Sequence, residues 1–199
     1  MPSVFRPASE IKADLEARFP SLRNARWIIK SPQNDSYKCI PWAACRTDIW
    51  WWPVDDPQVY WPPGIPFDDK IEFFIDAFAT SGYKPCNGCK FEFGYQKVAI
   101  YANADHRVQH MARQQFLGRG WLSKCGSLED ILHSDLQCIE GDPSPWAHSY
   151  GKVEQILKRS WWSALVNLCI FRCIWAAFKF WLYRLIHPSW IWSNILRWK

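Results

Sequence analysis

The order of hydrophobic patterns along the chain limits its fold more than any other feature. The first half is mainly helical, and its clearest segment, residues 68–82, places apolar side chains at the spacing of one helix face. Three segments typical of strands follow, at residues 97–102, 110–114 and 121–124. Residues 117–120, Leu-Gly-Arg-Gly, suit a hairpin between the last two. Helices followed by strands predict an α+β fold, in which N-terminal helices pack on a small antiparallel sheet.

The N-terminal segment predicts one more helix and one more strand. Ser9 can cap a helix whose apolar residues Leu15 and Phe19 are four apart, and Pro20 stops it. Residues 27–29 then read as a short strand, whereas residues 127–133 resemble a capping sequence that leads into a short helix or turn. We therefore divide the chain into an N-terminal packing helix (1–19), an α+β domain (20–159) and a tail (160–199).

A cysteine stands where a loop is expected to turn into a helix, in residues 36–45. Pro41 suits the first turn of a helix, which Trp42 and the following alanines continue to about Arg46. Cys39 would then lie at the helix start, where unpaired N–H groups favour a thiolate. The alternative is that Cys39 is a small buried apolar residue, as most free cysteines are.

A cysteine nucleophile also needs a base and a group that orients the base. His110 is our candidate for the base, because it begins a predicted strand some seventy residues after Cys39. Ser123, on the paired strand, or His133, just past the hairpin, could be the orienting group. The alternative for His110 is an ordinary histidine of a strand.

Several of these motifs together resemble a poorly characterised microbial domain family. Its members carry Tyr-Asn-Cys-Ile-Ala-Trp-Ala, His-Ala-Ala-Arg-Gln and Trp-Thr-Ser-Lys-Leu-Gly in this order, and the chain has similar sequences from Tyr37, His110 and Trp121. The resemblance covers roughly residues 20–159. It implies a papain-like fold similar to that of the NlpC and CHAP amidases, with Cys39, His110 and either Ser123 or His133 as the site. The expected function is cysteine-dependent hydrolysis of an amide or peptide of unknown identity, without a cofactor. The alternative is a non-catalytic interaction or scaffold protein of the same fold.

Tryptophans and prolines dominate residues 47–64. Their rings could wall a substrate cleft, in which case the candidates are Trp42, Trp51, Trp52 and Trp61, or they could cap the core.

A zinc site is the rival interpretation of part of this region. Cys86 and Cys89 are followed, after sixteen residues, by His106 and His110, which is close to the spacing of a zinc finger. The two hypotheses compete, because His110 cannot be both a free base and a zinc ligand.

The net charge of +5 comes from the tail. From residue 151 onward there are eight Lys or Arg residues and one Glu, which leaves the first 150 residues at −2. This distribution argues against a nucleic-acid binder with a broad basic face. The first nineteen residues carry three acids and lack the apolar core of a secretory signal, so we expect a cytoplasmic protein. Its eight cysteines should then stay reduced, bind metal or react, rather than form disulfides.

The tail predicts a hydrophobic, basic helix. Residues 160–171 carry no charge, and Arg172 and Lys179 fall on nearly the same side of a helix. Such a helix could pack on its own domain or on a helical partner, lie in a membrane interface, or span the membrane. We expect it to tether the domain to a partner or to the inner face of a membrane.

Overall fold

The structure is a computed structural model that describes residues 6–141 and 150–161. Its helices are α1 (Ala8–Arg18), α2 (Cys39–Ala43) and α3 (Ile71–Ala79), with 3-10 helices η1 (Pro20–Asn24), η2 (Phe116–Gly118) and η3 (Leu136–Ile139). Its strands are β1 (Trp27–Ser31), β2 (Trp50–Trp51), β3 (Val59–Tyr60), β4 (Lys84–Cys86), β5 (Tyr95–Ala102), β6 (Val108–Gln114), β7 (Trp121–Lys124), β8 (Asp130–His133) and β9 (Lys152–Ser160). The described residues up to Ser160 belong to one compact unit.

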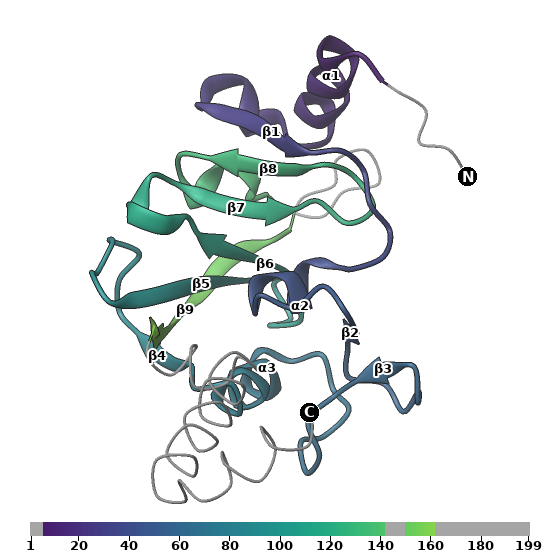
Figure 1. Cartoon of the computed structure of the whole chain (residues 1–199), viewed down its shortest axis with the longest axis vertical. Coiled ribbons are helices and arrows are strands. Elements are labelled where there is room, and N and C mark those ends of the chain that lie inside the picture. Colours follow the sequence, from purple (N-terminus) through teal and green to yellow (C-terminus); the bar gives the residue numbers. More distant parts are fainter. Residues whose placement is uncertain (1–5, 142–149, 162–199) are drawn as a thin grey trace, which may run out of the picture. The chain divides into compact units, whose positions relative to one another are not determined.

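Seven strands form one antiparallel sheet in the order β1-β8-β7-β6-β5-β9-β4 (Figure 1). Strands β2 and β3 form a separate parallel pair. The α+β class predicted from the order of patterns is confirmed. The sheet is larger than we predicted, because β4, β8 and β9 join the strands expected from the sequence.

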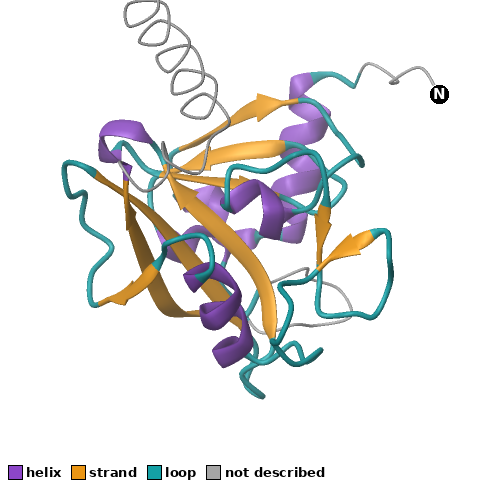
Figure 2. Cartoon of the chain, turned by 60° about the horizontal axis from the view of Figure 1, so that its bottom comes forward, coloured by secondary structure: helices purple, strands orange, loops and turns teal. Residues whose placement is uncertain are grey.

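The sheet carries a hydrophobic core on each face, and β5 shows how one strand supplies both. Val98 and Ile100 belong to one core and Ala99 and Tyr101 to the other, as expected when successive side chains point to opposite faces. The first, here called the α2–α3 core, contains Ile40, Ala43 and Ala44 of α2 and Phe74, Ala77 and Phe78 of α3. The second, here called the α1 core, contains Leu15, Phe19, Leu22, Leu136, Cys138 and Ile139 from α1 and the adjoining 3-10 helices. Figure 2 shows helices on both faces of the sheet.

Of the helix or turn expected within residues 127–133, the turn alternative is confirmed at its start and the helix does not form, because Asp130–His133 is strand β8. The backbone N–H of Leu128 donates to the carbonyl of Cys125, and Gly126 adopts the left-handed region with φ 60°, so the chain turns tightly and returns beside β7. Residues Trp121 to Lys124 then pair with His133 to Asp130 in antiparallel register. A tight turn therefore overrides the local capping signal.

Helices α1 and α3 form where helices were predicted, although Ser9 does not cap α1, which has Pro7 at its N-cap, and α2 is shorter than expected. Leu15 is fully buried on α1, and Phe74 and Phe78 are fully buried on α3. Helix α2 ends at Ala43 because Cys45 takes the left-handed region, with φ 64°, before Arg46 is reached.

The predicted C-terminal helix begins at residue 160, and beyond Trp161 it lies outside the described residues. Within the described ranges, every helix is too short or too polar to cross a membrane.

Candidate functional site

Cys39 is the first residue of α2, and it lies against the face of the sheet that α2 covers. Its side chain is half-buried and packs against the α2–α3 core. Burial raises the pKa of its thiol, while the backbone N–H groups of Met111 and Ile40 and then the Lys124 ammonium oppose this rise. The sulfur is therefore next to the backbone of β6, and the charge of one cation favours its thiolate form.

His110 lies on the other face of the sheet from Cys39. It pairs with Tyr101 across β5 and β6, and its ring stacks on that of Tyr150, with centroids 4.0 Å apart and planes 12° apart. The ring is fully buried, and neither nitrogen has a hydrogen-bond partner among the described residues. Burial lowers the pKa of His110 well below its usual value, and His133 lowers it further. The structure therefore does not form the expected hydrogen-bonded pair of Cys39 and His110.

Lys124, and not His110, is the basic side chain whose charge acts on the Cys39 thiol. It ends β7 and is fully buried, and its ammonium donates a hydrogen bond of 2.5 Å to the carbonyl of Leu128. The same ammonium lies 3.8 Å from Oδ1 of Asp130 and 5.7 Å from the ring centre of Tyr37. Burial lowers the pKa of Lys124, and Asp130 partly opposes this effect. Burial thus shifts this amine toward its neutral, basic form.

Asp130 and Tyr37 hold the lysine in place. The hydroxyl of Tyr37 donates to Oδ2 of Asp130 at 3.2 Å, and burial, followed by Asp130, raises the pKa of Tyr37. Oδ1 of Asp130 is buried without a hydrogen-bond partner in the described part of the chain, so its contact with Lys124 is ionic only. The contact of Tyr37 with Asp130 therefore joins the loop before α2 to the β7–β8 hairpin.

Comparison with family models shows where this chain belongs. A model described as a domain of unknown function, DUF7689, matches residues 28–158, which is well over half of the chain. The chain belongs to the DUF7689 family. Comparison with curated proteins and with solved structures gives no match. The resemblance inferred from the motifs is thus confirmed at the level of a family of unknown function, and no link to papain-like folds is shown.

Ser123 and His133 do meet within the DUF7689 domain, but inside the α1 core. Oγ of Ser123 lies 2.8 Å from Nε2 of His133, whose Nδ1 lies 2.7 Å from the carbonyl oxygen of Asp135. A carbonyl oxygen only accepts, so Nδ1 donates and Nε2 accepts from the serine. Both side chains are fully buried, and burial lowers the pKa of His133 to about 4. This neutral pair is buried and ties β7 to β8.

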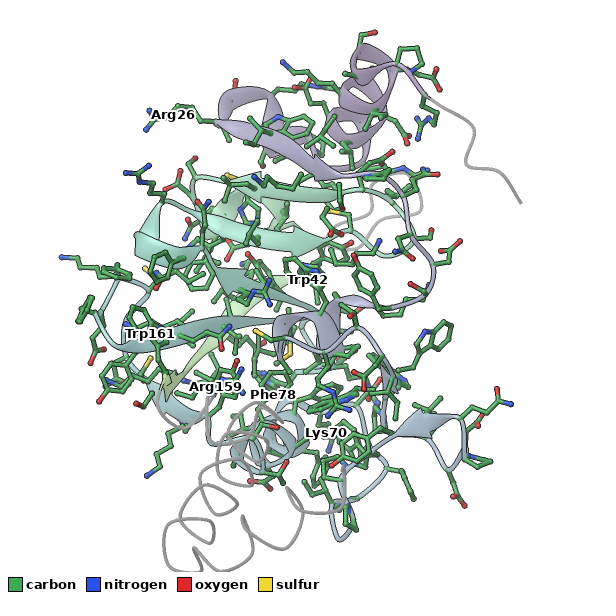
Figure 3. All side chains as sticks on the ribbon, in the orientation of Figure 1. Arg26, Trp42, Lys70, Phe78, Arg159 and Trp161 are labelled. Carbon is green, nitrogen blue, oxygen red and sulfur yellow. The ribbon has the colours of Figure 1, made fainter. Side chains whose placement is uncertain are left out.

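Three of the four proposed cleft tryptophans belong to the core of the DUF7689 domain. Trp51 and Trp61 are buried in the α2–α3 core. Trp42 is also buried, and the guanidinium of Arg113 lies 4.4 Å from its ring centre; Figure 3 labels it beside the sheet. Trp52 is 36% exposed and lines a small cavity of about 310 Å³ with Phe67 and Arg107 among others. The structure thus assigns most of this aromatic segment to packing.

The proposed zinc ligands are dispersed. His106 is exposed and lies 2.9 Å from Glu154, whose hydrogen bond raises the pKa of His106, whereas His110 is buried in the α1 core region. Cys86 is half-buried in β4 and Cys89 is exposed after it. Residues 6–141 and 150–161 contain no group of three or more His, Cys, Asp or Glu side chains suited to a metal ion. The structure therefore does not bring the rival set together.

Sequence reasoning missed Lys124 and also Cys45. Cys45 is exposed just beyond α2, and its sulfur lies 2.9 Å from both Nε2 of Gln96 and Nη1 of Arg113. These partners follow Cys45 by 51 and 68 residues, so no local pattern could reveal the contact. Lys124 did carry a signal, since it directly follows Ser123 in the motif that begins at Trp121.

Proposed function

We propose that this DUF7689 domain is a cysteine-dependent hydrolase of amide or peptide bonds, with Cys39 as the nucleophile and Lys124 as its base. The observation that carries the proposal is that the backbone N–H of Met111 donates to the Cys39 sulfur at the start of α2, while the charge of the buried Lys124 ammonium favours the thiolate. Helix α2 packs on β6 and β7 of an antiparallel sheet, and this supports a papain-like arrangement in which lysine replaces the usual histidine.

The proposed chemistry needs no group beyond these side chains and water. Lys124 in its neutral form takes the proton of the Cys39 thiol, and the sulfur attacks the carbonyl carbon of the substrate. The carbon–nitrogen bond breaks, the Lys124 ammonium returns its proton to the leaving amine, and water hydrolyses the resulting thioester. The backbone N–H groups of Met111 and Ile40 face the sulfur and are in place to stabilise negative charge on the carbonyl oxygen.

Acylation of Cys39 tests this function. Incubation with p-nitrophenyl acetate should give a burst of p-nitrophenolate and an acetyl thioester that peptide mass mapping places on Cys39. Cys39→Ala should lose that thioester, whereas Cys89→Ser, which alters an exposed cysteine away from α2, should keep it. Acetylation of the exposed cysteines alone, with Cys39 unmodified, would contradict the proposal.

A second candidate is an interaction module of the same fold. Exposed apolar side chains gather in the segment around β2 and β3: Trp50 is 44% exposed, Val54 38% and Phe67 57%. Such side chains suit a protein partner. We further propose that residues 160–199 tether the domain, because their sequence is rich in tryptophan and basic residues.

Liposome flotation tests the proposed tether. Vesicles that contain anionic lipid should carry the full chain upward, and a chain that ends at Arg159 should stay at the bottom. Equal behaviour of the two chains would show that the tail does not bind membranes and would leave a protein partner as its target.

A further inference from the structure

A cavity lies at the end of the β7–β8 pair that is opposite to its connecting turn. It has a volume of about 800 Å³ and is bordered by α1, η1, the start of β1, the β6–β7 turn and the end of β8. Gly120 and His133 line it, while Lys124 and Asp130 stand at the other ends of the same two strands. Four residues of strand separate the two places, roughly 10 Å. A volume of this size suits a small-molecule ligand.

Three arginines line this cavity without a side-chain partner among the described residues. Arg23, Arg26 and Arg119 are exposed, and none of their guanidinium groups makes a hydrogen bond or ion pair within the described residues. Figure 3 labels Arg26 where β1 begins. Every other arginine in the described ranges has a side-chain contact: Arg6, Arg18, Arg46 and Arg107 with carboxylates, and Arg113 and Arg159 with hydrogen-bond acceptors. The arginines without a side-chain partner among the described residues thus all line this one cavity.

The remaining charges of the cavity do not neutralise these arginines. Glu16 lies 3.8 Å from Lys12 on the same helix, and Asp135 accepts a hydrogen bond of 2.6 Å from the hydroxyl of Ser134. The cavity therefore has an excess of positive charge, although the first 150 residues of the chain carry a net charge of −2. Trp27 and Ile28 add apolar surface beside the charges.

We propose that this cavity binds an organic phosphate, with the phosphate oxygens held by Arg23, Arg26 and Arg119 and the organic part against Trp27 and Ile28. A guanidinium offers parallel N–H groups that match phosphate oxygens, and several unpaired guanidinium groups favour a ligand with more than one negative charge. The proposal does not depend on the reaction proposed for Cys39, because the two places share no side chain.

Calorimetric titration of the full chain with ATP, tripolyphosphate and adenosine tests this proposal. ATP should bind most tightly, tripolyphosphate several-fold more weakly, and adenosine not measurably. Arg26→Ala and Arg119→Ala should each weaken ATP binding about tenfold or more, since each removes charged hydrogen bonds. The matched control, Arg46→Ala, removes an exposed arginine that pairs with Asp48 away from the cavity, and it should leave binding unchanged.

We expect the arginine variants to fold like the wild type, because the substituted side chains are exposed and unpaired within the described residues. A loss of ATP binding would therefore not result from a loss of folding. Failure of ATP and tripolyphosphate to bind at millimolar concentration would overturn the proposal, as would binding that the cavity variants leave unchanged. Equal affinity for ATP and tripolyphosphate would overturn the role of Trp27 and Ile28. Cys39→Ala should bind ATP like the wild type, which separates this site from the hydrolase.

Discussion

Acidification from pH 6.5 to pH 4 should lower the free energy of unfolding by about 3 kcal/mol through His133 alone. Burial lowers the folded-state pKa of His133 to about 4, against about 6.5 in the unfolded chain. The unfolded state then binds more protons between these two values, so stability is complete above pH 6.5 and falls as the pH drops toward 4. The pKa of His110 is lowered in the same direction and adds to the loss. Urea unfolding at a series of pH values measures the effect.

His110→Phe is the variant that checks this explanation. A phenyl ring can keep the stack on Tyr150 and removes two buried nitrogens that lack partners within the described residues. The free energy of unfolding should therefore fall less steeply on acidification, because up to one proton fewer is bound on unfolding. His106→Gln is the control, because His106 is exposed and its pKa is raised by Glu154 rather than lowered. Two results would contradict the claim that these histidines are buried and neutral. One is a free energy of unfolding that depends on pH equally in His110→Phe and the wild type, and the other is equal stability of the wild type at pH 4 and pH 7.

Gly151→Ala should destabilise the domain by about 3 kcal/mol or more. A Cβ at this position would lie 1.9 Å from the carbonyl oxygen of Ala102, which belongs to β5, and Gly151 has a φ of 76°. The clash is with backbone, which cannot move aside, and the left-handed conformation costs an alanine about 1–2 kcal/mol in addition. Urea unfolding at neutral pH measures the loss.

Gly64→Ala separates the two contributions. Gly64 has a similar φ of 84°, but a Cβ there would have nothing within 4 Å. This variant should lose only about 1 kcal/mol, the conformational part. Equal losses at Gly64 and Gly151 would mean that the close approach of Gly151 to β5 does not matter.

Much of the fold was predictable because its elements carry local patterns. Leu15 and Phe19 indicate α1, Phe74 and Phe78 indicate α3, and the buried run of β5 indicates a strand. Strands β8 and β9 were not predictable in the same way. Residues 127–133 look locally like a capped helix start, and β9 is specified by its pairing with β5 and β4, whose paired residues precede it by fifty residues or more.

The candidate site was predictable only in part, because the sequence does not show to which face of the sheet a given strand residue points. The sequence places Cys39 at the start of a helix, and the structure agrees. In a strand, neighbouring residues point to opposite faces, so His110 and Met111 separate, as do Ser123 and Lys124. Which of each pair faces α2 depends on which face the helix covers, and no local pattern specifies this choice. The motif was correctly located, and the basic side chain whose charge acts on Cys39 is Lys124.

The central claim is that Cys39 reacts with help from Lys124. The most direct test is the rate of acetyl thioester formation on Cys39 in two variants. Lys124→Met combined with Asp130→Asn removes the buried pair together, which avoids leaving one charge unpaired, and we expect the rate at pH 7 to fall about 100-fold. His110→Phe should keep the wild-type rate, because His110 lies on the other face of the sheet. A loss of the thioester in His110→Phe, with the wild-type rate retained when Lys124 and Asp130 are replaced, would contradict the account.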